Sequence, residues 1–323
     1  MHKTLHSIQL IRDYMEAKNL IKYPISNIDD IYKFFIYITN NENKYKFNSL
    51  YIFNYIEQYI VNEEVAKRKT SARIFEDLLA IIFKGNIADN YHRENLVRAV
   101  PDYFNLSKDD IAKNKREKID VLFSNSYGVS IKTLMENNTE INLGAFEKRV
   151  LFDDFGLNLS ERKGGLGSKI QLKNVFEKLK TNNFYEKFAD RFIHMFNFIF
   201  SDDIIIAIKY IKKLKLYFLE GAFFTNFITS KVNNIDDFLT VINRWEGNSI
   251  RIDRNLLLDN CQKVITIDLS FLNDTIIKSI NDFDLELHQT YVKYFNNKNN
   301  QNYKNNIFSK LDTLFKKFDN CFK

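Results

Sequence analysis

The chain has 323 residues, of which 45% are hydrophobic and 15% aromatic, so it can bury a sizeable core and is not expected to be disordered. Its formal net charge of +6 favours a polyanionic partner, but lysine and asparagine are abundant throughout, so only local clusters of charge indicate one. No apolar run approaches the roughly 20 residues of a membrane span, and the N-terminal segment is charged throughout, so neither a transmembrane helix nor a signal peptide is expected.

Cysteine and histidine give no sign of a metal or redox site. Cys261 and Cys321 lack the spacing of a metal or redox motif, and the five histidines are scattered. The sequence therefore predicts a cytoplasmic protein without a disulfide framework.

The first part of the chain is predicted to be helical. Residues 5–66 repeat apolar residues at intervals of three and four, in three segments. A further helix follows, with Thr70 or Ser71 as its cap and Gly85 at its end. Glu76 lies among its apolar residues, either at the wet edge of the helix or directed toward a site.

A basic run precedes the next regular element. Residues 109–118 include Lys113, Lys115, Arg116 and Lys118, which either form a solvated helix face or contact phosphate groups. The segment before it, around Pro101, is predicted as a short strand or helix that ends at the proline.

Residues 118–134 are predicted to form a β-hairpin around the turn-prone SNSYG. With Ser126 at the tip, Val121 would pair with Ile131 and Asp120 with Lys132. Side chains alternate along a strand, so Asp120, Leu122, Ser130 and Lys132 would share one face, opposite the apolar set Ile119, Val121, Phe123, Val129 and Ile131. A cross-strand Asp–Lys pair is also a common surface contact worth at most about 1 kcal/mol, so the pair alone does not identify a site.

Polar loops and one helix near residues 144–155 are expected after the hairpin. Basic or amide side chains recur there, and by position and chemistry five are candidate DNA contacts: Asn142, Lys148, Arg149, Arg162 and Lys163. The glycines of KGGLGS match no nucleotide-binding spacing, so a flexible loop is predicted at that point.

The remaining chain alternates helices and strands. Helices are predicted within residues 170–199, two strands within 202–221, a helix at 234–245, a strand near 263–272 and a helical tail from Leu285. We therefore predict an α/β fold in one compact domain. It comprises a helical region at 1–66, a core at 67–280 and a helical extension at 281–323.

The hairpin face and the preceding helix together suggest metal-dependent phosphodiester hydrolysis. Mg²⁺ prefers oxygen ligands and is usually held by one or two carboxylates. Asp120 and Glu76 can supply these, and the backbone carbonyl of Ile131 lies between the two strand residues of interest. Lys132 would position or deprotonate the attacking water and offset charge at the phosphate, with Ser130 in support.

At this point the chain resembles a known family. A helix Glu76, a strand Asp120 and the run Ser130-Ile131-Lys132 look like the PD-(D/E)XK nuclease core, and the chain is most similar to a type II restriction endonuclease of a low-GC bacterium. The resemblance implies a restriction-endonuclease-like, mixed and mostly four-stranded central sheet flanked by helices. The hairpin would be its catalytic centre.

The sequence departs from that pattern in two places. Ile119 stands where proline often precedes the aspartate, and Ser130 occupies the position that is usually acidic. A Pro-Asp pair does occur at residues 101–102, but the hairpin argument favours Asp120.

The function implied by the resemblance is Mg²⁺-dependent cleavage of double-stranded DNA at a short sequence, leaving 5′-phosphate ends. A homodimer would match a palindromic site, and a cognate DNA methyltransferase would be encoded nearby. Two alternatives stay open: a non-catalytic nucleic-acid-binding protein that uses its lysine and arginine runs on phosphates, and a helical assembly protein in which the Asp–Lys pair is an ordinary surface contact.

Overall fold

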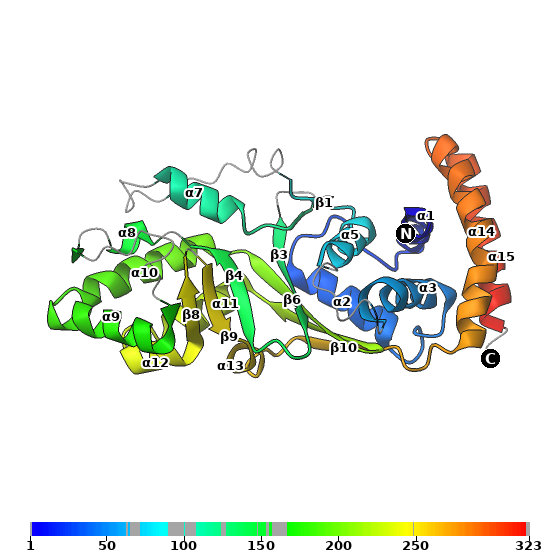
Figure 1. Ribbon diagram of the computed structural model, residues 1–323. Coiled ribbons are helices and arrows are strands. Elements are labelled where there is room, and N and C mark those ends of the chain that lie inside the picture. Colours follow the sequence, from blue (N-terminus) through cyan, green and yellow to red (C-terminus); the bar gives the residue numbers. More distant parts are fainter. Residues whose placement is uncertain are drawn as a thin grey trace.

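The computed structural model describes residues 2–62, 64, 72–89, 100, 108–123, 127–146, 148–152, 155–156, 167–247 and 249–320. Within these residues the chain is an elongated α/β body (Figure 1). Helices from both ends of the chain gather at one end of the body, and a small second sheet with its own helices forms the other. No helix in the described part of the chain is both long and apolar enough to span a membrane.

The helices of the N-terminal half are α1 (His2–Ala17), α2 (Ile28–Thr39), α3 (Phe47–Ile56), the π-helix η1 (Glu57–Val61), α5 (Ala72–Ile82), α7 (Lys108–Arg116) and α8 (Arg149–Phe152). Those that follow are α9 (Lys169–Thr181), α10 (Tyr185–Ile199), α11 (Gly221–Thr229), α12 (Ile235–Val241), α13 (Arg254–Leu258), α14 (Asp274–Asn297) and α15 (Gln301–Asp319).

The central sheet is mixed and has the strand order β1-β2-β3-β6-β7-β10 among the described residues. Its strands are β1 (Asn86–Ile87), β2 (Val121–Leu122), β3 (Gly128–Met135), β6 (Asp203–Tyr210), β7 (Lys213–Leu219) and β10 (Val264–Asp268). β3 and β6 run parallel, and all other neighbours are antiparallel. The α/β class is therefore confirmed, with six strands where four were expected.

Both faces of this sheet are covered, which explains the unbroken apolar run of β6. Ile205 and Ala207 belong to one hydrophobic cluster, whereas Ile204, Ile206 and Ile208 belong to another on the opposite face. A strand buried on both faces needs apolar residues at every position rather than at alternate ones. The two predicted strands of this region are thus confirmed as β6 and β7.

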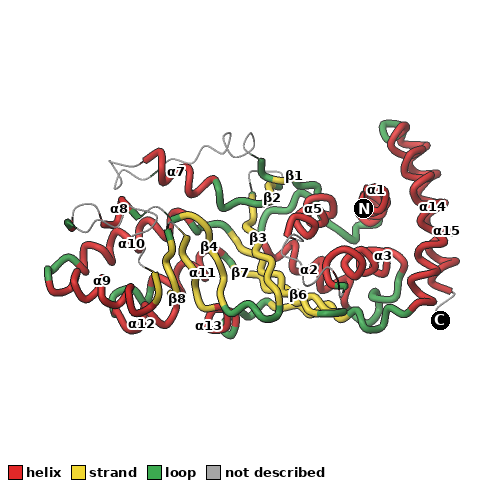
Figure 2. The backbone as a smooth tube through the Cα atoms, in the orientation of Figure 1, coloured by secondary structure: helices red, strands yellow, loops and turns green. Residues whose placement is uncertain are grey.

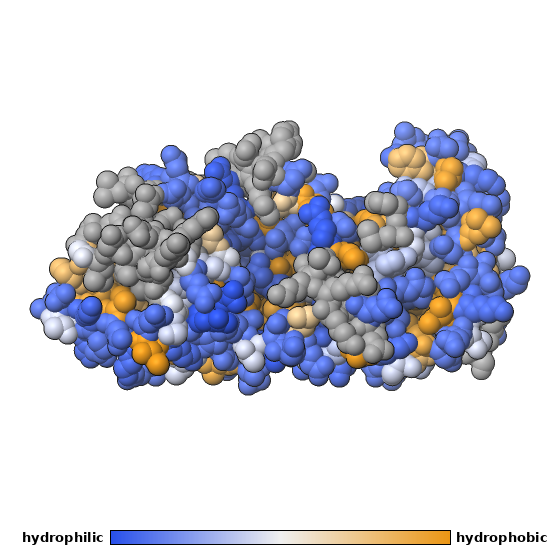
Figure 3. All heavy atoms as spheres, in the orientation of Figure 1, coloured by the Kyte–Doolittle hydropathy of each residue, from blue (hydrophilic) through white to orange (hydrophobic). Residues whose placement is uncertain are grey.

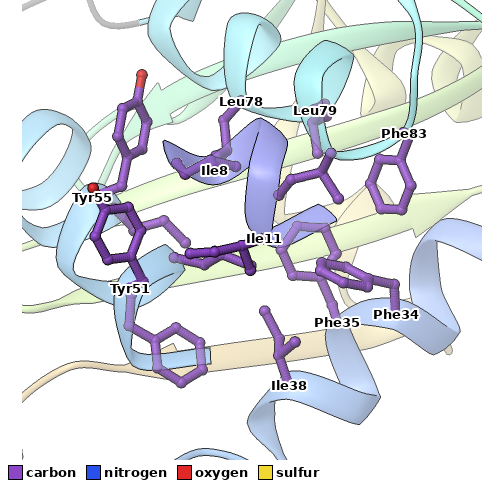
Figure 4. Packing of buried hydrophobic residues seen from close by; sticks show 14 of the residues in the cluster. Ile8, Ile11, Phe34, Phe35, Ile38, Tyr51, Tyr55, Leu78, Leu79 and Phe83 are labelled. Atoms are coloured by element: carbon purple, nitrogen blue, oxygen red, sulfur yellow. The ribbon is translucent and has the colours of Figure 1, made fainter. Parts of the chain in front are cut away.

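The helices of the two chain ends form one layer on the first face. Figure 4 shows Ile8 and Ile11 of α1 packed among side chains of α2, α3 and α5. Tyr14 of α1 and Lys18, which directly follows the helix, both bond to Asp312 of α15, at 2.6 and 2.7 Å. The regions predicted separately at residues 1–66 and 281–323 therefore pack together, and the C-terminal helices begin at Asp274, earlier than expected.

A second sheet, with the order β4-β9-β8-β5, was not predicted. It consists of β4 (Glu140–Ala145), β9 (Ser249–Asp253), β8 (Ile242–Glu246) and β5 (Gly167–Ser168), shown among the yellow strands of Figure 2. The helix expected to reach Trp245 ends at Val241, and the segment after it is strand β8. These strands are short, and bulges or irregularities in the β4–β9 and β8–β9 pairs interrupt the alternation of apolar and polar residues. Without that alternation, the polar residues of β4 indicate a loop from the sequence alone.

Candidate active site

The predicted hairpin is present, with a shifted register. β2 and β3 pair Val121 with Val129 and Leu122 with Gly128, two residues away from the predicted partners. Tyr127 was assigned to the turn, but its carbonyl accepts from Phe123 N–H at 2.7 Å and its hydroxyl bonds Asp203 at 2.8 Å. A shift of two residues leaves every side chain on its predicted face, because strand side chains alternate with a period of two.

Four of the five predicted apolar residues, Val121, Phe123, Val129 and Ile131, are buried in one hydrophobic cluster. Ile119 is buried too, but outside that cluster and beside Gly128, because it precedes the strand. On the opposite face, Lys132 Nζ lies 3.5 Å from Asp120 Oδ2, and both side chains keep about a fifth of their surface exposed, 22% and 20%. The predicted carboxylate and ammonium therefore meet at a position that solvent can reach.

Asp120 is held by the neighbouring strand through several contacts. Its Oδ2 accepts the backbone N–H of Ile131 at 2.6 Å and the hydroxyl of Ser130 at 3.3 Å. Its own backbone N–H donates to Val129 O at 2.9 Å. Ser130, which stands where the resembled family has an acid, thus orients the carboxylate of Asp120 and adds no second negative charge.

Glu76 reaches the same place from α5. Phe75, Leu78 and Leu79 fix this helix in the core, and the side chain of Glu76 keeps 14% of its surface exposed. Burial and the negative charge of Asp120 raise the pKa of Glu76 to about 7, while the cations Arg73 and Lys132 lower it. The helix α5 packs against β2 and β3, which carry or adjoin Asp120 and Lys132. The carboxylate of Glu76 itself forms an ion pair with Arg73 at 3.8 Å.

The end of α5 is anchored to the N-terminal helices. Arg12 Nη1 donates to Ile81 O at 2.9 Å, and the hydroxyl of Tyr23 donates to Ile82 O. Both acceptors are carbonyls of the last helical turn, which have no partner within a helix. This capping holds the helix, and with it Glu76, in place.

The residues present fit a hard divalent cation. Within the described ranges no group of three or more His, Cys, Asp or Glu side chains could hold a metal, but Mg²⁺ needs only one or two carboxylates and keeps several waters. Burial and the negative charge of Asp120 raise the pKa of Glu76, and a bound cation would offset the contribution of Asp120. Asp120 and Glu76 would be its side-chain ligands, and the carbonyl of Ile131 remains a predicted third.

The predicted basic contacts fall into three groups. Lys113 is exposed, Arg116 is partly exposed on α7, and Asn142 is exposed on β4. Lys115 and Lys148 are buried, with 2% and 1% of their surface exposed, so the prediction that they contact DNA is wrong. Arg162, Lys163 and the side chain of Arg149 lie outside the described residues, as does the alternative Pro-Asp pair at 101–102.

The error at Lys115 has a clear physical cause. Its ammonium bonds Asp202 at 2.5 Å and Ser201 at 2.7 Å, so the lysine is part of a buried ion pair. Ile111 and Asn114 on the same side of α7 are buried too. The sequence of the basic run does not distinguish a buried lysine from one on a solvated helix face.

Lys118 belongs to the site but was counted only as part of the basic run. It is 5% exposed, and its Nζ donates to Leu143 O at 3.2 Å and to Ala145 O at 2.5 Å. Burial and the nearby charge of Lys132 lower the pKa of Lys118 to about 7. Lys118 lies in the turn between α7 and β2, outside any strand, so no strand alternation in the sequence could have identified it.

In the view of Figure 1, α5 and α7 lie on opposite sides of β3. Hydrophilic side chains cover most of the face shown in Figure 3, with hydrophobic residues scattered among them.

A scan against protein-family models, a search of curated proteins and a search of solved structures each returned no match.

Proposed function

We propose that this chain is an Mg²⁺-dependent endonuclease of the PD-(D/E)XK type that hydrolyses double-stranded DNA. The observation that carries the proposal is the meeting of Lys132 with Asp120 at 3.5 Å, on a hairpin that packs against the helix carrying Glu76. An ordinary surface ion pair between the strands would not need a third, partly buried acid on the helix that packs against them.

Each residue has a part in the proposed reaction. Asp120 and Glu76 would hold the cation, which supplies charge neutralisation at the phosphorane and a more acidic bound water. Ser130 keeps the Asp120 carboxylate oriented through its hydroxyl. Lys132 would orient or deprotonate the attacking water and offset the negative charge that develops at the phosphate.

The architecture supports the same reading. A hairpin that carries the acid and the lysine, followed by the parallel strand β6 and backed by a helix that carries a second acid, is the arrangement implied by the resemblance. Lys113, Arg116 and Asn142 are candidate contacts for the DNA. Cleavage at a short palindromic sequence by a homodimer, as in a type II restriction system, completes the proposal.

Plasmid cleavage with a matched pair of control variants tests this function. Lys132→Ala, Asp120→Asn and Glu76→Gln should each abolish Mg²⁺-dependent nicking and leave DNA retention measurable. Lys213 and Asp268 are paired across β7 and β10 on the same face of the same sheet, so Lys213→Ala and Asp268→Asn repeat the charge changes away from the site.

The outcomes separate the proposal from its nearest alternative. Cleavage that depends on Mg²⁺, stops with EDTA and survives only in the control variants supports the nuclease. Salt-sensitive DNA retention without turnover would instead identify a non-catalytic nucleic-acid-binding protein.

A further inference from the structure

A buried lysine connects the candidate active site to the second sheet. Lys118 precedes Asp120 by two positions, in the turn that connects α7 to β2. Its ammonium reaches across to β4 and donates to the carbonyls of Leu143 and Ala145, at 3.2 and 2.5 Å. The segment that carries Asp120 is thus bonded to a strand of another sheet.

The acceptors belong to an irregular part of β4, which we call the Gly144 bulge (residues 142–145). Pairing of β4 with β9 shifts register between Asn142 and Ala145, and Gly144 has φ +78°. From the outer side, Asn142 Oδ1 accepts the Gly144 N–H at 2.8 Å and the Ser249 hydroxyl at 2.6 Å. Lys118 holds the bulge from the inner side, so the bulge is fixed on both sides.

Packing alone does not call for a lysine at this position. The ammonium of Lys118 lies 5.0 Å from the ring centre of Phe200, in surroundings where an uncharged side chain would be buried at lower cost. It also lies near a second cation, Lys132, which disfavours a positive charge here. What the lysine adds is a pair of directed hydrogen bonds to the bulge.

We propose that Lys118 is a positioning residue, which ties the Asp120 segment to the Gly144 bulge and so fixes the carboxylate for metal binding. The inference rests on the proposed function, because it assigns Lys118 a role at that metal site. Residues that orient metal ligands from outside the coordination shell commonly change metal affinity about 10–100-fold when they are replaced.

The direction in which Mg²⁺ affinity changes when Lys118 is replaced distinguishes a positioning role from a purely electrostatic one. Removing a cation near the Asp120 carboxylate would tighten Mg²⁺ binding if charge were its only contribution. Removing a positioning residue lets Asp120 move and weakens binding. Lys118→Met should therefore raise the Mg²⁺ dissociation constant about tenfold or more, measured by isothermal titration calorimetry.

A second variant changes the contact without changing any charge. A Cβ at residue 144 would lie 3.4 Å from Lys118 Nζ, on a backbone with positive φ. Gly144→Ala should therefore also weaken Mg²⁺ binding. Lys209→Met is the matched control, since Lys209 is a buried lysine of β6 opposite Met135, at the other end of β3.

Hydrogen exchange tests the connection without reference to the metal. Lys118→Met should speed amide exchange in both Asp120–Leu122 and residues 143–146, whereas Lys209→Met should leave both segments unchanged. Faster exchange in only one segment would overturn the connection.

The metal experiment completes the test. If wild-type protein binds Mg²⁺ and cuts DNA while Lys118→Met binds Mg²⁺ equally or more tightly, the positioning role is wrong and the proposed function stands. If wild-type protein neither binds Mg²⁺ nor cuts DNA, the proposed function fails and the metal role of Lys118 fails with it. Coupled exchange would then show the connection to be structural only.

Discussion

Replacing Glu76 with glutamine should change how the stability of the protein depends on pH. Burial and Asp120 raise the pKa of Glu76 from 4.5 to about 7 in the folded chain. Each pKa unit corresponds to about 1.36 kcal/mol, so the shift of about 2.5 units corresponds to about 3 kcal/mol. The side chain is only 14% exposed, so solvent screening leaves most of that value in place.

The sign follows from the direction of the shift. A carboxyl group whose pKa is higher in the folded state favours folding when protonated, so its contribution is fully present below about pH 4.5. The contribution is lost as the pH rises through about 7, and above that pH the ionised Glu76 destabilises the fold. The variant Glu76→Gln cannot ionise. The free energy of unfolding of the variant relative to that of the wild type should therefore be higher at pH 8.5 than at pH 5, by up to about 3 kcal/mol.

Urea unfolding followed by tryptophan fluorescence measures this difference. The single tryptophan, Trp245, is buried and reports on the loss of tertiary structure. Saturating Mg²⁺ should raise the free energy of unfolding of the wild type at pH 8.5 and raise that of Glu76→Gln much less. An equal stability difference between the two proteins at pH 5 and pH 8.5 would refute the reasoning, because Glu76 would then not share a site with Asp120.

Three further outcomes follow from the described contacts. Lys115→Met should lower the free energy of unfolding by about 3–5 kcal/mol in urea titrations, since it leaves the buried Asp202 carboxylate without its lysine; a loss below about 1 kcal/mol would contradict the buried pair. Gly221→Ala should cost about 1–3 kcal/mol by the same assay, because its Cβ would press against the Ser201 backbone carbonyl, and an unchanged midpoint would show that the turn can relax. Lys113→Ala should leave the free energy of unfolding within about 0.5 kcal/mol of the wild type, because the side chain is exposed. If Lys113 contacts a phosphate, the slope of the logarithm of DNA affinity against the logarithm of salt concentration should fall in magnitude by about 1, and an unchanged slope would exclude Lys113 from the interface.

The candidate site could be predicted because it depends on alternation, a property of the strand itself. The turn residues predicted the existence of the hairpin but not its pairing. Tyr127 follows the turn rather than lying in it, and its hydroxyl bonds Asp203, a distant residue of β6. The faces of Asp120 and Lys132 survived that error, since a two-residue shift preserves them. Local chemistry was therefore sufficient to bring these two side chains together.

Features that depend on distant partners were not predictable in the same way. Lys115 is buried because Asp202, far along the chain, receives its charge. In the second sheet, Ile141 and Leu143 of β4 share one hydrophobic cluster with Ile250 and Ile252 of β9. The two strands lie far apart in the sequence, so a local pattern could not predict that they pair. The helical ends also pair through contacts such as Tyr14 with Asp312, which only the assembled fold brings together.

The most direct test of the account is cleavage of supercoiled plasmid by purified wild-type protein and by Lys132→Ala, with Mg²⁺ and with EDTA. The account predicts nicked or linear products from the wild type with Mg²⁺ only, and none from Lys132→Ala even though it still binds DNA. Full Mg²⁺-dependent cleavage by Lys132→Ala would contradict the assignment of this site.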